Sequence, residues 1–360
     1  MNYSASQKRF LDTTSEISET DREQQYADLE RQLVKDAIRV FPASYGRRVI
    51  AKDESQHPFS ESHYDRCWIN LLHSLERQGK IIPGKTYLLE VTSGSAGRSL
   101  GNIARLLGYH TTIVVPPLDP ARRVGVAEAA DEVVDSAYPE EMLAGAVRTF
   151  RERIGTVTGD AFRLSKEAKM HIAQRVLGLP NHSKVEETPA TFEAIGEECV
   201  TQIHNTTHIG AFVGAIGNGT TIKGILNGLR KSYGHDVPFY GYTGPRELFG
   251  AGGTKGVDFR FVNELREQGI IRKDNTFCVT PEEWEQTFEE INRGQPRELT
   301  IGRTSAMSIA LARKLIEESK GEIGDVMTVI YDKADQYGNH TITDPHAMYV
   351  GNGDWRSSTT

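Results

Sequence analysis

Short apolar runs alternate along the chain with segments in which apolar residues recur every three to four positions. The runs are apolar or β-branched almost throughout, which is typical of strands buried on both faces, and the intervening segments predict helices. The runs are RRVIAK, TYLLEVT, HTTIVVPP, HIGAFVGAIG and DVMTVIYDK. Strands that alternate with helices indicate an α/β fold with parallel sheets. The number of units predicts two sheets with a cleft between them.

The N-terminal part has a helical period of its own. From Thr20 to Val40 the apolar residues fall at helical spacing, and Thr20 with Glu23 fits a capping box. We therefore expect a packing helix ahead of the alternating elements. Three parts are expected: an N-terminal extension with this helix over 1–45, a smaller α/β domain over 46–160 and a larger α/β domain over 161–360.

Composition narrows the function classes. The chain has 360 residues, 38% of them hydrophobic and 25% charged, with a net charge of −7. A mildly acidic protein is poorly suited to nucleic acid or anionic membranes, and no apolar run approaches the ~20 residues of a membrane span. No secretory signal is apparent, so a cytoplasmic protein is expected. The three cysteines have no zinc or disulfide spacing, no metal site is expected, and Cys67 alone is kept as a candidate reactive thiol.

Two glycine-rich turns each follow an expected strand and open an expected helix. Small residues let a ligand approach the backbone, and the N–H groups that begin a helix are unpaired. The first turn adds hydroxyl donors and predicts a site for a carboxylate or phosphate, with an ordinary capped turn as the alternative. Its residues are Thr92, Ser93, Gly94, Ser95 and Ala96.

The second turn lacks the Gly-Lys-Ser/Thr ending of a P-loop and the GxGxxG spacing of a dinucleotide site. Its residues are Gly217, Asn218, Gly219, Thr220 and Thr221. Two such turns in one chain indicate a ligand cleft. The expected partner is therefore a small anionic molecule, a carboxylate or a phosphate.

These segments resemble the cysteine synthase branch of the fold-type-II pyridoxal-phosphate (PLP) enzymes, the tryptophan synthase β-like superfamily. RRVIAKDESQHPFSESHYDR is similar to that family's strand followed by N-P-x-x-S-x-K-D-R, and IIPGKTYLLEVTSGSAG to P-G-x-T-L-x-E-x-T-S-G-N-T-G. GAIGNGTTIKG resembles the G-T-G-G-T loop. The other similar segments, in the family's order, are IVVPPLDPARR, ELFGAGGTKGVDF and GRTSAMSIALARKL.

The resemblance implies a two-domain α/β protein, usually a homodimer, whose lysine forms an imine with PLP. It also implies that the second turn, residues 217–221, holds the cofactor phosphate and that the first turn, residues 92–96, holds the substrate carboxylate. Ser305, with Thr304 as the register alternative, would face the pyridine nitrogen. A substrate-binding glutamine of the family aligns loosely with Arg175.

Two positions depart from the family's pattern. Tyr64 stands at the lysine position and Ser95 at the asparagine that contacts the cofactor ring. A phenol cannot form an imine, and with an unperturbed pKa near ~10 it is better suited to donate a hydrogen bond or a proton than to act as a base. Alternatively, the Tyr64 ring fills the pyridine space. PLP is therefore doubtful as a cofactor.

Three functions follow. The first is an enzyme of this family without the lysine–PLP imine, a lyase, transferase or cyclase for an amino-acid-like or phosphorylated metabolite with Tyr64 as acid or hydrogen-bond donor. The second is a non-catalytic binding or scaffold homologue. The third is a β-replacement or elimination enzyme that binds PLP non-covalently or recruits another lysine, such as Lys52. The two anion-binding turns favour the first.

Overall fold

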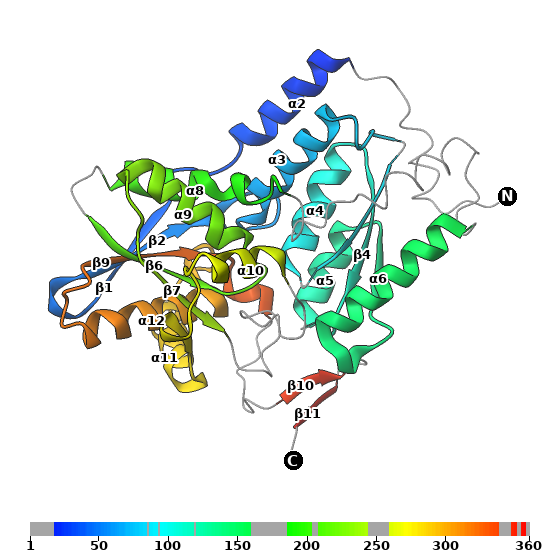
Figure 1. Cartoon of the computed structure of the whole chain (residues 1–360). Helices are drawn as coiled ribbons and strands as arrows, with labels where there is room; N and C mark the ends of the chain where they lie inside the picture. The colour runs from blue at the N-terminus through cyan, green and yellow to red at the C-terminus, as the bar shows by residue number, and fades with distance from the viewer. Residues whose placement is uncertain are drawn as a thin grey trace.

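The computed structural model of this chain describes residues 18–84, 86–92, 94–118, 120–159, 186–203, 208–243, 259–337, 347–350 and 354–357. In this part of the chain two separate sheets are flanked by helices, as Figure 1 shows. The expected α/β architecture with two sheets is confirmed.

The larger sheet has six strands in the order β1-β2-β9-β6-β7-β8. β1 runs antiparallel to β2, and all other neighbouring pairs are parallel. The strands are β1 (Ile38–Pro42), β2 (Arg48–Asp53), β6 (Ile209–Ala215), β7 (Phe239–Thr243), β8 (Thr276–Cys278) and β9 (Asp325–Ile330).

The smaller sheet is parallel throughout, in the order β3-β4-β5. Its strands are β3 (Tyr87–Val91), β4 (His110–Val115) and β5 (Glu132–Asp135). Every residue of β3 and β4 is buried, as their mostly apolar and β-branched runs predict. Near the C-terminus, β10 (Ala347–Val350) and β11 (Asp354–Ser357) form a separate antiparallel pair.

Helices cover the sheets because each has one apolar face. They are α2 (Glu19–Arg31), α3 (Tyr64–Arg77), α4 (Ser95–Leu106), α5 (Pro120–Ala129), α6 (Met142–Gly159), α8 (Glu193–Gln202), α9 (Thr220–Tyr233), α10 (Arg260–Glu267), α11 (Pro281–Asn292) and α12 (Arg303–Glu318). Short 3-10 helices are η1 (Ser44–Gly46), η2 (Glu54–Gln56), η3 (Pro139–Glu141), η4 (Pro189–Phe192), η5 (Lys273–Asn275), η6 (Arg297–Leu299) and η7 (Ala334–Tyr337).

The two faces of the larger sheet build two separate cores. Along β2, Val49 and Ala51 pack against α11 and α12, whereas Ile50 packs on the other side with α8 and α9. Successive residues of a strand point to opposite faces, so a run that is apolar at every position is needed to fill both cores. A third core lies between the smaller sheet, α3 and α4.

The predicted helix from Thr20 to Val40 is wrong in its length and its cap. α2 ends at Arg31, and Ser18 caps it by accepting a 3.1 Å hydrogen bond from the Asp21 N–H. Ile38–Pro42 instead forms β1. Pairing with β2 satisfies the backbone of these residues, and this tertiary contact overrides their helical spacing.

β1 and β2 both lie in the larger sheet, whereas the domain boundaries expected from the sequence place residues 46–53 in the smaller domain. The larger sheet therefore draws its strands from both ends of the chain, and the expected domain boundaries stay a prediction. No helix in the described ranges combines the length and the apolar character needed to cross a bilayer.

Candidate ligand site between the two sheets

Four loops from the carboxyl ends of parallel strands meet between the sheets, where ligands bind in open α/β folds. They are the β2–α3 loop, the turn before α4, the turn before α9 and the segment after β9. His63, at the end of the β2–α3 loop, contacts two of the others. Its Nε2 lies 3.4 Å from the hydroxyl of Thr221 at the start of α9, and its ring lies 5.2 Å from that of Tyr331 after β9. The structure thus brings together the regions that contain the predicted site residues.

Tyr64 is the first residue of α3 and lies at the centre of these loops. Its ring lies 4.1 Å from that of His63 and meets Phe192 edge-on at 6.2 Å. Burial raises the pKa of the Tyr64 phenol, and the nearby Arg122 guanidinium only partly opposes this shift. The phenol is therefore protonated at neutral pH, and it can donate a hydrogen bond or a proton but cannot serve as a base.

Asp65 fixes the loop that leads into α3. Its carboxylate accepts hydrogen bonds from the N–H groups of Phe59 and Ser60, at 3.0 and 2.9 Å, and from the Ser99 hydroxyl at 2.6 Å. Since Ser99 belongs to α4, this buried carboxylate ties the Tyr64 loop to the helix that begins at Ser95.

Arg66 points away from Tyr64 into a buried group of charges. Its guanidinium contacts Glu54 at 2.6 Å and Glu198 at 2.7 Å. The Lys52 ammonium lies 3.4 and 3.3 Å from the same two carboxylates, with no measurable exposure of its side chain. Lys52, the candidate that could take the place of the family's lysine, is thus held within an ion cluster. His57 bonds to Glu54 at 2.8 Å and so has a structural role in the loop.

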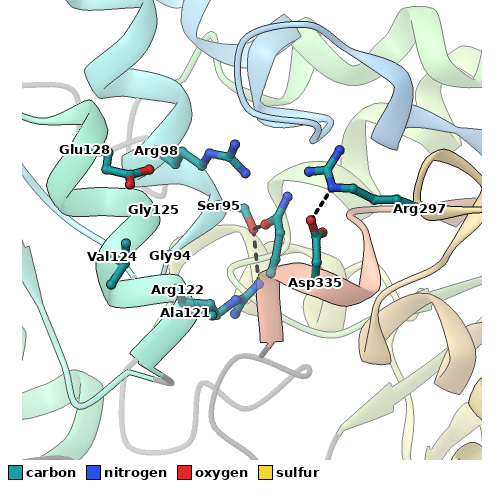
Figure 2. A pocket seen from close by; sticks show the side chains of 11 residues that line it. Gly94, Ser95, Arg98, Ala121, Arg122, Val124, Gly125, Glu128, Arg297 and Asp335 are labelled. Atoms are coloured by element: carbon teal, nitrogen blue, oxygen red, sulfur yellow. Dashed lines mark hydrogen bonds and ion pairs between the residues drawn. The ribbon is translucent and has the colours of Figure 1, made fainter. Parts of the chain in front are cut away.

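Ser95 and Arg122 contact a carboxylate from the other sheet. The Ser95 hydroxyl lies 3.2 Å from Asp332 and 3.1 Å from the Gln336 amide oxygen, and Arg122 donates to Ser95 at 3.1 Å and to Asp332 at 2.9 Å. Figure 2 shows Ser95 and Arg122 facing each other beneath the start of α4. We call the Ser95 and Arg122 side chains the carboxylate seat.

Gly94 is required at this turn. Its φ of 130° is a conformation that side-chain-bearing residues rarely adopt, and a Cβ there would lie 3.3 Å from the Arg122 Nε. The backbone two residues later is hydrogen-bonded as well, since the Ala96 carbonyl accepts a 2.7 Å hydrogen bond from the Trp68 indole N–H. Of the predicted turn, Thr92 donates its backbone N–H to the Val114 carbonyl of β4 at 3.1 Å, and Ser93 lies outside the described residues.

A pocket of about 150 Å³ adjoins the carboxylate seat, between α4, α5, η6 and η7. Its wall includes Arg98 and Arg297. Arg297 contacts Asp335 at 2.5 Å and Glu61 at 2.8 Å, and Arg98 lies 3.5 Å from Glu61. The pocket therefore offers cationic groups next to the seat, each already balanced by a carboxylate of the chain.

Residues of the turn before α9 make hydrogen bonds to one another. The Asn218 side-chain oxygen accepts from the Thr220 N–H at 3.0 Å and from the Thr220 hydroxyl at 2.7 Å. Gly219 has a φ of 88°, and a Cβ there would lie 2.8 Å from the Val262 nitrogen in α10. A Cβ on Gly217 would meet no atom within 4 Å, and the Gly217 N–H donates a 3.1 Å hydrogen bond to the Ala215 carbonyl.

Ser305 bonds to the chain's own backbone. Its hydroxyl accepts a 2.9 Å hydrogen bond from the Tyr331 N–H, and both residues are buried. Hydrogen bonds also join the Tyr331 hydroxyl to the Ala215 backbone and to Ser308, while burial raises the pKa of this phenol to about 12. Tyr331 thus spans the space between the end of β6 and the start of α12.

Where the resemblance places PLP, the described residues contact one another. The Tyr331 N–H donates to Ser305, the Tyr331 ring meets that of His63 edge-on, and Ser95 contacts Asp332 across the cleft. The residues expected to touch the cofactor phosphate, ring oxygen and ring nitrogen each contact another residue of the chain.

Four residues that organise the site were not predicted from the sequence to do so. They are Arg122, Tyr331, Gln336 and His63, the last as a bridge between loops. No local motif marks Arg122, since only the tertiary fold brings α5 over Gly94. Cys67 is wrong as a reactive thiol, because it is fully buried and burial raises its pKa to about 12. Arg175 and most of ELFGAGGTKGVDF lie outside the described residues.

Sequence comparison gives the relatives of this chain. The cysteine synthase of Staphylococcus aureus (strain N315) is 26% identical over 305 residues, which are 80% of this chain and 87% of that protein. Cysteine synthase 3 of Caenorhabditis elegans is 33% identical over 101 residues, 28% of this chain and 30% of that one.

Solved structures show the same fold. The O-acetylserine-dependent cystathionine β-synthase from Helicobacter pylori matches with a TM-score of 0.70 and 20% identity, over 88% of this chain and 98% of that chain. Cysteine synthase from Entamoeba histolytica matches with a TM-score of 0.66 and 15% identity, over 94% and 92%. Residues 37–252 match the family described as pyridoxal-phosphate dependent enzyme, and the chain therefore belongs to this family.

Proposed function

We propose that this chain is an enzyme of the cysteine synthase-like group that acts on a small amino-acid-like anion without a lysine–PLP linkage. The observation that supports this most directly is the place of Tyr64 at the start of α3, where its ring packs 4.1 Å from that of His63 and its phenol lies within electrostatic range of Arg122 and Asp332. The reaction class is a lyase, transferase or cyclase reaction, in which the group that leaves needs a proton.

Each residue has a defined part in this proposal. The ligand's carboxylate contacts the carboxylate seat, where a guanidinium and a hydroxyl give charge-assisted hydrogen bonds. Tyr64 then donates a hydrogen bond or a proton to the leaving atom. The His63 ring packs against the Tyr64 ring at a tilt of 38° and links it to Thr221 at the start of α9.

Replacing Tyr64 by Phe tests this role. With L-serine or O-acetyl-L-serine as probe substrate, we expect the variant to lose about 100-fold in kcat with little change in KM, because it keeps the ring and lacks only the donor. Tyr45→Phe is the matched control, since Tyr45 is 57% exposed and lies in η1. An unchanged kcat in Tyr64→Phe would remove Tyr64 from the reaction.

A second function, a non-catalytic binding homologue, is favoured by one observation. Both anion-binding turns already contact groups of the chain itself, Asp332 at the first and Asn218 at the second. Under this function the probes raise the melting temperature of the protein and none is turned over.

Binding of PLP without the family's lysine is the third alternative, and it has a simple test. The purified protein is incubated with PLP, desalted and scanned in the visible range. We expect no retained absorbance and no rise in melting temperature. Retained absorbance that borohydride removes would place PLP on an amine of this chain and contradict the proposal.

A further inference from the structure

A carboxylate of the chain, that of Asp332, contacts the carboxylate seat. It lies 2.9 Å from the Arg122 guanidinium and 3.2 Å from the Ser95 hydroxyl, and its side chain is almost fully buried. Asp332 follows β9 of the larger sheet, whereas Ser95 and Arg122 belong to helices beside the smaller one. The contact therefore crosses the cleft at the place where a ligand's carboxylate is expected.

We propose that Asp332 is an internal ligand of this seat, and that a free carboxylate binds by displacing it. The inference deepens the proposed function, on which it rests, by assigning Arg122 as the residue that binds the ligand's carboxylate. The Asp332 carboxylate and a ligand's carboxylate can bind in the same way, because a guanidinium pairs with any carboxylate by charge-assisted hydrogen bonds.

The geometry permits the exchange without unfolding the loop. The Asp332 carbonyl accepts a 2.8 Å hydrogen bond from the Gly302 N–H, so the backbone stays anchored while the side chain rotates. The pocket between α4, α5, η6 and η7 opens beside the contact. Arg98, on the same face of α4 as Ser95 and three residues later, lines the path that an incoming carboxylate would take.

Competition by a tethered carboxylate lowers the apparent affinity of every free one. The seat then selects ligands that make additional contacts in the cleft, because a carboxylate alone gains no advantage over Asp332. Asp332 is in this sense a specificity-determining residue, since it excludes simple carboxylic acids and admits larger ligands with the same head group.

The test compares the binding of L-serine and L-serinamide, which lacks the carboxylate, by calorimetry. We expect Asp332→Asn to bind L-serine about tenfold more tightly than the wild type, with no such gain for L-serinamide. Asp135→Asn is the matched control, because Asp135 pairs with Arg123, the residue after Arg122 in α5, at an exposed position outside the pocket. It should change the affinity by about twofold or less.

Arg122→Gln should abolish L-serine binding, whereas Arg123→Gln, the next residue of α5 with an exposed partner in Asp135, should not. A crystal structure of the wild type with L-serine gives a readout that needs no variant. We expect the serine carboxylate on Ser95 and Arg122, with the Asp332 carboxylate rotated away.

Equal or weaker L-serine binding by Asp332→Asn overturns the inference, and so does bound L-serine beside an intact Arg122–Asp332 contact. No L-serine binding by either protein overturns it as well. The proposed function fails separately, through an unchanged kcat in Tyr64→Phe, so the two failures can be told apart.

Discussion

At the scale of single residues, burial decides which groups of this chain are reactive. Tyr64 stands where the resemblance implies a lysine, and burial raises the pKa of its phenol. Burial also raises the pKa of Cys67, three residues later, to about 12. Neither group ionises near neutral pH. Proton donation by Tyr64 is therefore available across the physiological range, whereas thiolate chemistry at Cys67 is not.

Thiol reactivity checks this directly. Cys67 and Cys199 are buried and Cys278 is exposed, so an aromatic disulfide reagent at pH 8 should label Cys278 quickly and leave the other two unmodified until the protein unfolds. Cys278→Ser should remove the fast phase. A fast phase that survives this change would show that a buried thiol is accessible.

At the scale of elements, the ion cluster of Lys52, Glu54, Arg66 and Glu198 joins β2, η2, α3 and α8. Burial alone would raise the pKa of Glu54, but the Arg66 guanidinium, with His57 and Lys52, holds it well below its usual value. The positive charges of Lys52 and Arg66 equal the negative charges of the two glutamates, so loss of one carboxylate leaves a buried positive charge uncompensated. The cluster thereby fixes where α3, and hence Tyr64, begins.

Glu54→Gln should therefore lower the free energy of unfolding by about 3–5 kcal/mol near pH 7, measured by urea denaturation. Because the folded pKa of Glu54 is depressed, its contribution is present above the unfolded pKa of ~4.3 and is lost as the pH falls through the folded value. The difference between the two proteins should shrink below that pH.

Glu290→Gln is the control for this experiment, since Glu290 pairs with Arg313 on the surface. Its cost should stay below about 1 kcal/mol. A loss in Glu54→Gln as small as in the control would mean that the cluster contributes nothing to positioning α3.

The elements themselves could largely be predicted from the sequence, because each apolar run is explained by local burial. β3 and β4 are apolar or β-branched at most positions and are buried at every position, the Glu90 and His110 side chains included. Ile38–Pro42 could not be predicted, since its strand conformation depends on pairing with β2. The same limit applies to the site: glycines and hydroxyls mark the two turns, but only the assembled fold shows that Arg122, Tyr331 and Asp332 meet them.

At the scale of the whole molecule, the chain keeps the fold of its family while its own side chains cross the cleft. Asp332 reaches Ser95 from the larger sheet, and His63 and Tyr331 join the turn before α9 to the start of α12. These contacts surround Tyr64, which stands where the resemblance implies a lysine. Restoring one residue should therefore not restore the cofactor site.

Tyr64→Lys tests this expectation. After incubation with PLP and desalting, we expect no visible absorbance that borohydride removes, because the Tyr331 side chain still occupies the space between the Ala215 backbone and Ser308 of α12. Adding Tyr331→Ala opens that space and should allow such absorbance to appear. Tyr45→Lys controls for surface lysines, whose PLP adducts are lost on desalting. Stable absorbance in Tyr64→Lys alone would show that the cleft is open to the cofactor and that a single amine is all it lacks.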